Sequence, residues 1–216
     1  ASWGRLDRLI AALLKAVPGI ERLRLTSMDP AEVTPELVDL FKSEPRLMGH
    51  LHLSMQSGAD AVLKRMARRH RQADLLRLRD RLPDIALGAD LIAGFPGEGE
   101  ADHQDTLALV ERLGMAHLHV FPFSARPGTP AARLKRLTGD VVKARAADLR
   151  QAGARQRTRL LAGFLGKNVR VLVEEAGKGF CEAYLPVVFE GGSPGGIETV
   201  RIDKAEDDGL QGHIVS

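Results

Sequence analysis

GADLIAGFPGEGEAD, residues 88–102, joins an apolar run to a glycine-rich turn and then to an acidic segment. The run Ile85–Phe95 is almost entirely apolar and is bounded by two prolines, which is typical of a parallel strand covered on both faces. The acidic residues that follow the glycines favour the start of a helix. These residues therefore predict a strand, a loop and a helix in this order.

The glycine-rich turn is a candidate ligand site, because ligands bind at the C-terminal ends of parallel strands. Gly94, Gly97 and Gly99 lie at that end of the strand, and a residue without a Cβ lets a ligand approach the backbone. The carboxylates within residues 98–102 favour a ligand with cationic character over a phosphate. The alternative is that these acids only complement the dipole of the helix.

Asp90 is a charged residue inside the apolar run. Strand alternation places Asp90, Ile92 and Gly94 on one face, so the carboxylate is expected to point to the same side as the glycine. An unpaired buried charge is costly, so either a ligand or a structural ion pair is expected beside it.

The same strand–helix pattern occurs on both sides of this unit. The other expected strands are Glu21–Ser27, His50–Gln56 and His117–Ser124, and the other expected helices are Arg5–Val17, Glu36–Lys42, Asp60–Arg69, Ala73–Arg81 and Val141–Leu165. Strands that alternate with helices predict a parallel sheet. Four units are too few to close an eight-stranded barrel. The predicted fold class is therefore α/β, a partial parallel (βα) barrel consisting of its last four βα units.

The pattern changes after Leu165. Short apolar strands, among them Cys181–Phe189, are separated by glycine-rich turns such as GGSPGG at residues 191–196. This pattern is typical of a small antiparallel β-barrel or sandwich. We therefore expect a domain boundary near Leu165, with one domain at residues 1–165 and a small barrel at residues 166–216.

Composition narrows the class of protein. The chain has 216 residues, of which 44% are hydrophobic and 27% charged, as in ordinary globular proteins. No apolar run reaches membrane-spanning length and no signal peptide opens the sequence, so no membrane partner is expected and the expected location is the cytoplasm. Cys181 is the single cysteine, which excludes both a disulfide framework and a cysteine-ligated metal cluster formed by these residues alone.

Charge is distributed unevenly along the chain. Residues 126–170 contain twelve Lys or Arg and two Asp, a net charge of +10, whereas residues 171–216 contain three bases and nine acids, a net charge of −6. A basic block of this size favours a polyanionic partner. The alternative is a solvated helix face.

Four motifs together resemble a known family. They are LRLTSMDP (23–30), HLHLSMQSGAD (50–60) with VLKRMARRH (62–70), GADLIAGFPGE (88–98) and HLHVFPFSARPGTPAA (117–132). In this order and spacing they resemble the third to sixth βα units of the radical S-adenosylmethionine methylthiotransferases. The terminal fifty residues resemble the TRAM domain, an OB-like barrel, that follows in that family. SMQSG and VFPFSARPGTPAA are most similar to the branch that converts N-threonylcarbamoyladenosine next to the tRNA anticodon to its 2-methylthio derivative.

The resemblance implies S-adenosylmethionine as the cofactor, whose sulfonium and ammonium groups agree with an acidic loop. The implied cofactor-binding residues are Ser54, Gln56, Ser57, Arg68, Asp90, Ile92, Gly94, Phe121, Phe123 and Ser124. Two alternatives stay open from the residues themselves. Gln56 could be a polar strand-end residue without a ligand, and the phenylalanines could belong to the core.

The family's cluster-binding cysteines, C-x-x-x-C-x-x-C, do not occur in this chain. The resemblance implies that they precede residue 1, in a missing N-terminal half that would hold the 4Fe-4S clusters. No catalytic residue and no metal ligand is expected within residues 1–216, and the chain alone is expected to be inactive. Histidines alternate on two expected strands and could be read as a metal site, but strand histidines are commonly only hydrogen-bonded. These histidines are His50, His52, His117 and His119.

The implied partner is tRNA, at the anticodon stem-loop, and the complete enzyme is expected to be a monomer. The expected RNA-binding residues are Arg145, Arg150, Arg155, Arg157, Arg159, Lys167 and Arg170. Alternative functions are a truncated, non-catalytic tRNA-binding module, a methylthiotransferase acting on isopentenyladenosine in tRNA, and an unrelated small-molecule barrel enzyme.

Overall fold

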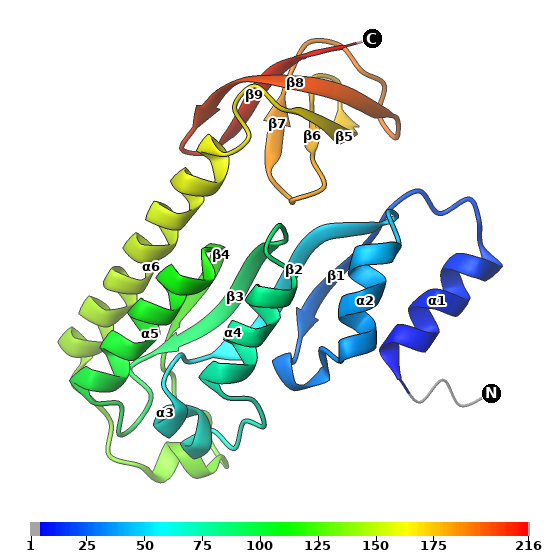
Figure 1. The fold of residues 1–216 in the computed structure, drawn as a ribbon. Helices are drawn as coiled ribbons and strands as arrows, with labels where there is room; N and C mark the ends of the chain where they lie inside the picture. Colours follow the sequence, from blue (N-terminus) through cyan, green and yellow to red (C-terminus); the bar gives the residue numbers. More distant parts are fainter. Residues whose placement is uncertain (1–4, 216) are drawn as a thin grey trace. The chain divides into compact units, whose positions relative to one another are not determined.

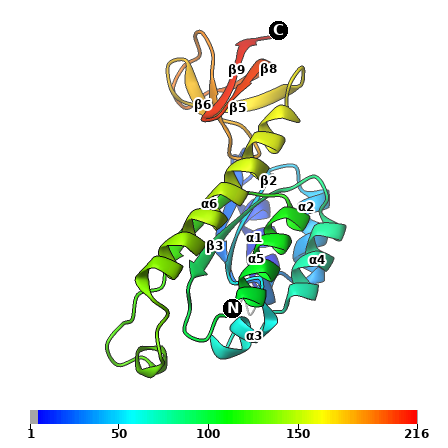
Figure 2. The same ribbon diagram turned by 90° about the vertical axis from the view of Figure 1, so that its left-hand side faces the viewer.

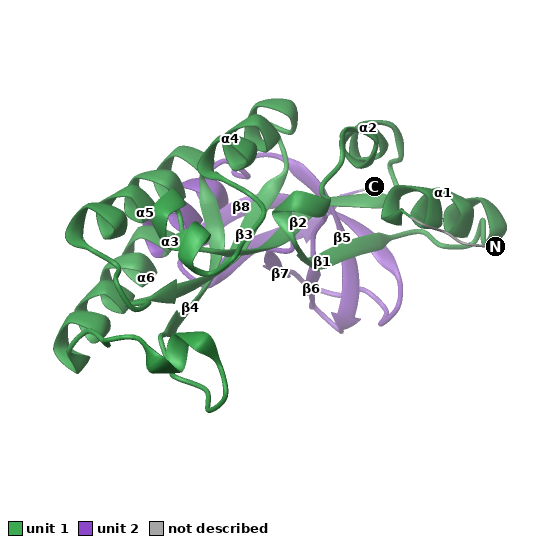
Figure 3. Ribbon diagram, turned by 90° about the horizontal axis from the view of Figure 1, so that it is seen from below, with its two compact units in different colours: residues 1–153 green, residues 154–216 purple. Residues whose placement is uncertain are grey.

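A computed structural model describes residues 5–215. The chain forms two compact units, residues 1–153 and 154–216, shown in separate colours in Figure 3. The division between them falls inside the helix α6 (Gly139–Ala162). Among the described residues, no helix is both long and apolar enough to cross a lipid bilayer.

The first unit contains one parallel sheet with the strand order β1-β2-β3-β4 (Figure 1). The strands are β1 (Leu23–Met28), β2 (Leu47–Gln56), β3 (Ala86–Ala93) and β4 (Met115–Pro122). The helices are α1 (Leu6–Ala16), α2 (Pro35–Ser43), α3 (Asp60–Arg65), α4 (Gln72–Arg81) and α5 (Glu100–Leu113), with short 3-10 helices at η1 (Pro30–Glu32) and η2 (Pro130–Arg133). Each of these strands pairs in parallel with its neighbour, which confirms the predicted partial (βα) barrel.

Local sequence sets the ends of these helices. The Thr34 hydroxyl accepts a hydrogen bond from the Leu37 amide at 3.3 Å, and Pro35 occupies the first turn of α2. Gly114 ends α5 in the left-handed conformation, with φ of 61°. The predicted helix Asp60–Arg69 is wrong in its C-terminal part, because α3 ends at Arg65 and Ala67 has a left-handed φ of 56°.

The two faces of the sheet differ in chemistry. On β2, Leu51, Leu53 and Met55 are fully buried and belong to the hydrophobic core that the sheet forms with the helices (Figures 1 and 2). The intervening residues point to the opposite face, which we call the polar face. The polar face carries His50, His52, Ser54 and Gln56 on β2, Gly88, Asp90 and Ile92 on β3, and His117, His119 and Phe121 on β4.

The second unit contains the C-terminal part of α6 and a closed five-stranded barrel with the order β5-β6-β7-β9-β8. The strands are β5 (Asn168–Glu175), β6 (Lys178–Phe180), β7 (Pro186–Val188), β8 (Ile197–Glu206) and β9 (Gly209–Ile214). The small barrel predicted from the glycine-rich pattern is confirmed, and its pairings are antiparallel except for β7 with β9.

One predicted strand of the barrel was wrong. Cys181–Phe189 is interrupted by a turn in which the Tyr184 amide donates to the Cys181 carbonyl at 3.1 Å. Tyr184 has a left-handed φ of 59°, so only β7 continues as a strand after the turn. The Cys181 side chain is fully buried inside this unit.

Candidate functional site

A cavity of about 500 Å³ lies at the C-terminal ends of β2, β3 and β4. It is lined by Gln56, Asp90, Ile92, Phe121, Pro122, Phe123, Ser124, Arg126, Thr129 and Ala131. Six of the ten predicted cofactor-binding residues are among them. The parallel register brings them together, because it aligns the ends of all three strands at one edge.

The two predicted phenylalanines have different surroundings. Phe123 packs edge-on against Phe95 with 5.4 Å between ring centroids, and with Ile92 it joins a small hydrophobic cluster. Phe121 is 52% exposed. The core-packing interpretation therefore applies to Phe123, whereas the Phe121 ring is open to a planar ligand.

The other four predicted cofactor residues do not line this cavity. Ser57 is buried, where its hydroxyl accepts from the Ala59 amide at 3.2 Å and lies 3.4 Å from the Thr106 hydroxyl. Arg68 lies 3.8 Å from the Asp29 carboxylate. Ser54 is half-buried on the polar face of β2.

Gly94 is turned toward α6. It has a φ of 74°, and an added Cβ would lie 2.6 Å from the Cγ2 atom of Val142. A glycine is required there by packing and backbone conformation, and this position faces protein rather than the cavity.

The acids of the glycine-rich loop do not form an open shelf, and the cationic character of the ligand stays a prediction. Glu98 is buried, and its carboxylate accepts from the Gly94 amide at 3.2 Å and from Arg145 Nη1 at 2.8 Å. Arg65 donates to the Gly97 carbonyl at 2.8 Å and lies 3.2 Å from Asp102. Arginines of the chain itself therefore pair with Glu98 and Asp102 of the loop.

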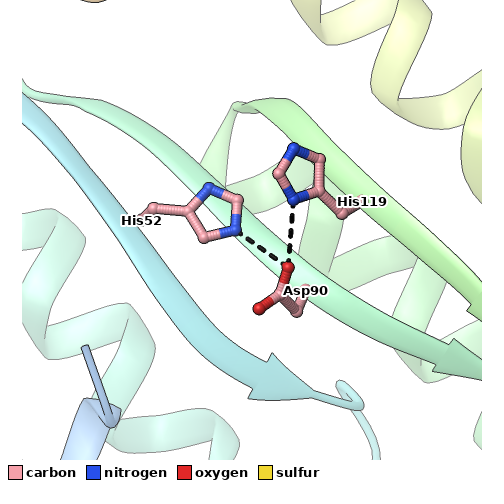
Figure 4. A group of neighbouring side chains, drawn as sticks. All are labelled: His52, Asp90 and His119. Carbon is pink, nitrogen blue, oxygen red and sulfur yellow. Dashed lines mark hydrogen bonds and ion pairs between the residues drawn. The ribbon is translucent and has the colours of Figure 1, made fainter. Parts of the chain in front are cut away.

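Asp90 is the carboxylate that remains at the cavity, and it contacts two histidines (Figure 4). Its Oδ1 atom lies 3.1 Å from Nε2 of His52 and 3.2 Å from Nδ1 of His119. The Asp90 side chain is 26% exposed. The sequence predicts a ligand or an ion pair beside Asp90 but does not identify His52 and His119 as its partners, although residues at alternate positions of neighbouring strands were a signal for them.

A second pair of histidines lies deeper on the polar face. The rings of His50 and His117 are in edge contact, with 5.1 Å between centroids. Burial, and to a smaller extent the nearby charges of His117, Arg24 and His52, together lower the pKa of His50 to about 3. His50 is therefore neutral at physiological pH.

The predicted RNA-binding residues fall in two units and in different environments. Arg145 is buried against Glu98, which leaves no open face for a phosphate, and we omit it from the candidate RNA surface. Arg150 in the first unit is exposed and donates to the Val120 carbonyl at 3.1 Å. Arg157 in the second unit donates to the carbonyl of Asp208 at 3.0 Å. The predicted RNA-binding residues that are exposed in the second unit are Arg155, Arg159, Lys167 and Arg170.

The first unit also contains a basic cavity of about 330 Å³, which the sequence did not predict. Three cationic side chains, Arg136, Lys143 and Arg150, line it together with Gly94 and Phe123. A concave site with three cations suits a phosphate or another anion. The signal in the sequence was the basic block, but only the fold shows which of its members converge.

Residues 3–110 match the model of the Radical SAM superfamily. The chain is 40% identical to a threonylcarbamoyladenosine tRNA methylthiotransferase MtaB of Thermotoga maritima, over 93% of this chain and 49% of the relative. It is 40% identical to the MtaB of Rickettsia prowazekii, over 85% of this chain and 44% of the relative. A tRNA-2-methylthio-N(6)-dimethylallyladenosine synthase of Cereibacter sphaeroides is 36% identical, over 99% of this chain and 52% of the relative. The chain thus spans about half the length of the curated relatives it matches.

The structure is also similar to coproporphyrinogen III oxidase (HemN) from Escherichia coli, described as a radical SAM enzyme. The TM-score is 0.54 at 21% identity, and the match covers 68% of this chain and 37% of that one. At this identity the similarity supports the fold only.

Proposed function

The chain belongs to the radical SAM superfamily, and from this we propose that it is the C-terminal portion of a tRNA methylthiotransferase that converts N-threonylcarbamoyladenosine next to the anticodon to its 2-methylthio derivative. The observation that carries this proposal is the 40% identity to two enzymes of that name over most of this chain. The second candidate substrate is dimethylallyladenosine, because synthases named for that nucleoside are 36 to 40% identical.

The cavity at the strand ends supports a site for S-adenosylmethionine. Its volume of about 500 Å³ suits a small molecule, and it combines one carboxylate with apolar and hydroxyl side chains. In this proposal Asp90 faces the cationic part of the cofactor, Phe121 packs on the adenine, and Gln56 and Ser124 donate or accept hydrogen bonds. The bound cofactor would supply a reactive sulfonium.

An iron–sulfur cluster does not fit the residues of this chain. Such clusters are held by several thiolates, whereas Cys181 is the single cysteine and is buried in the small barrel unit. We therefore assign the 4Fe-4S clusters to an N-terminal half outside these residues, and no reaction step to the chain alone.

Contact with tRNA would use the exposed cations of both units. In the first unit these are the three residues of the basic cavity, and in the second unit they are Arg155, Arg159, Lys167 and Arg170. Residues 166–216 would serve as the TRAM domain, and residues 1–165 as the end of the radical SAM barrel. We further propose that the complete enzyme is a cytoplasmic monomer that binds the anticodon stem-loop.

The proposal is tested with the complete gene that encodes this chain. Total tRNA from a deletion strain should lack 2-methylthio-N-threonylcarbamoyladenosine in nucleoside mass spectrometry, and the wild-type gene should restore it. Restoration by an Asp90→Ala variant is expected to be at least tenfold weaker, whereas His213→Ala in the small barrel should restore fully. Loss of the 2-methylthio dimethylallyl nucleoside instead would support the second candidate, and unchanged levels of both nucleosides would contradict both.

A further inference from the structure

Three side chains form a cluster on the polar face of the sheet (Figure 4). They are His52 on β2, Asp90 on β3 and His119 on β4, which are adjacent strands. Strand register explains the cluster, since His119 is the β4 partner of Asp90, and His52 is the β2 partner of Gly88. One potential ligand atom from each residue lies within 4.8 Å of the other two. The cluster therefore offers two imidazole nitrogens and one carboxylate oxygen as possible metal ligands.

Two of the three distances in the cluster agree with shared coordination of one ion, and the third, between the two imidazole nitrogens, is within 4.8 Å. Ligand atoms about 2.1 Å from a metal, at angles between about 90° and 109°, lie roughly 3.0 to 3.4 Å apart. The two separations from Asp90 Oδ1, 3.1 and 3.2 Å, fall in this range. One ion is held by all three residues once the two imidazole rings rotate to bring their nitrogens into the same range.

Gly88 provides an independent reason to regard the cluster as a built site. A Cβ at residue 88 would lie 2.6 Å from Nδ1 of His52 and 2.7 Å from the carbonyl oxygen of His117. The φ of Gly88 is not in the left-handed region, so backbone conformation does not require a glycine. The missing Cβ instead makes room both for the His52 ring beside Asp90 and for β4 at His117.

We propose that His52, Asp90 and His119 bind a divalent transition-metal ion of the Zn²⁺ or Co²⁺ class. Imidazole and carboxylate ligands suit such ions, and a set of three protein ligands leaves coordination positions for water or a small molecule. Asp90 lines the 500 Å³ cavity and the His119 side chain is 64% exposed, so solvent has access to the ion. The proposal goes beyond the tRNA-modifying function and does not depend on it. While the ion is bound, it occupies the Asp90 carboxylate in place of the cationic part of the cofactor.

Other His–Asp pairs of the described structure differ from this cluster, and two of them have short contacts. Nδ1 of His213 lies 2.7 Å from Asp203, and Nε2 of His103 lies 3.2 Å from Asp148. Each of these pairs lacks a third ligand of the kind found beside Asp90. His213 therefore provides a matched control, an imidazole–carboxylate pair without the geometry of a three-ligand site.

The test is a titration of the metal-free chain, residues 1–216, with Co²⁺, followed by visible absorption and by calorimetry. We expect one Co²⁺ per chain, displaced by Zn²⁺. His119→Ala removes a ligand and Asp90→Asn replaces a charged carboxylate by a neutral amide, so each should weaken the affinity at least tenfold. His213→Ala should bind as the wild type does.

Two results would overturn the proposal. The first is the absence of saturable binding at one ion per chain. The second is binding by His119→Ala and Asp90→Asn that equals the wild type. Circular dichroism and thermal melting confirm that the variants fold, and His119→Ala removes little packing because its side chain is largely exposed. If Asp90→Asn does not fold, His52→Gln serves as the second ligand variant.

Discussion

His50 and His52 lie two residues apart on the polar face of β2, yet they have different neighbours. His50 is almost completely buried against His117, whereas His52 contacts the carboxylate of Asp90. Both side chains leave the strand on the same side, so spacing along the chain cannot distinguish them. The two histidines have different surroundings because the strand register places different residues of β3 and β4 beside each of them.

The free energy of unfolding should fall in acid because of His50. Its pKa in the folded chain, about 3, lies below the ordinary value of 6.5, so the unfolded chain binds the proton first as the pH falls. Stability is therefore lost progressively between about pH 6.5 and pH 3, by roughly 1.4 kcal/mol per pH unit where only the unfolded chain is protonated.

Urea unfolding at several pH values measures this effect. The wild type should lose stability more steeply below pH 6.5 than His50→Leu, and the difference between the two should level off near pH 3. The pKa of His70 is also lowered by burial, so some slope is expected to remain in the variant. Equal slopes for the two proteins would contradict the prediction.

At the scale of elements, the buried pair of Glu98 and Arg145 links the loop before α5 to α6. Arg145 donates both to the carboxylate and to the carbonyl of Glu98, at 2.8 and 2.9 Å. The Arg145 side chain is 9% exposed and the Glu98 side chain is 4% exposed. This pair joins the loop to α6, and it uses an arginine of the basic block for packing inside the first unit.

Replacing Arg145 should destabilise the fold more than any exposed arginine of the same helix does. Arg145→Ala leaves the Glu98 carboxylate buried without its cation, which costs roughly 3 to 5 kcal/mol. Arg150→Ala, at an exposed position of α6, should change the unfolding free energy by less than about 1 kcal/mol.

Chemical unfolding, monitored by circular dichroism, measures the change in unfolding free energy for both Arg145→Ala and Arg150→Ala. The double variant Glu98→Gln with Arg145→Met should recover part of the loss, because the uncompensated charge is gone. A loss below about 1 kcal/mol in Arg145→Ala would show that the pair does not hold the loop.

For the whole molecule, the relevant quantity is the distribution of exposed cations. Residues 126–170 carry a net charge of +10, but some of these cations are used inside the protein. Those that stay exposed occur in both compact units. Binding of tRNA should therefore depend on salt through cations of both units.

Affinity for a tRNA anticodon stem should fall as salt rises, because each neutralised phosphate releases counterions and contributes about −0.9 to the slope of log affinity against log salt. Replacing Arg155, Arg159 and Arg170 with Ala should reduce the steepness by about two to three units. Discrimination between modified and unmodified nucleosides should be largely retained, since phosphate contacts position the RNA without specifying a base.

Two further triple variants make this test specific. Alanine at Arg136, Lys143 and Arg150 should flatten the slope if the basic cavity of the first unit binds phosphates. Alanine at Arg8, Lys15 and Lys42, which are exposed on α1 and α2, removes the same charge and should leave the slope unchanged. Unaltered slopes in both test variants would indicate that the basic block is only a solvated helix face.

Much of the fold could be predicted from local sequence. Alternating strands and helices predicted the parallel sheet, Thr34 and Gly114 marked helix ends, and glycine-rich turns predicted the small barrel. These features depend on periodicity and on the conformational preferences of single residues, which are properties of short segments. The motifs at the strand ends likewise identified six residues of the cavity.

Partners across long distances in the chain could not be predicted. The burial of Arg145 against Glu98 and the contact of Asp90 with His52 and His119 depend on which side chains converge after the sheet and helices pack. A charge pattern reports how many cations and anions a segment carries, whereas desolvation and pairing depend on three-dimensional neighbours. The sequence therefore determined the order of elements and the family, and tertiary packing determined which charged groups are available to a ligand.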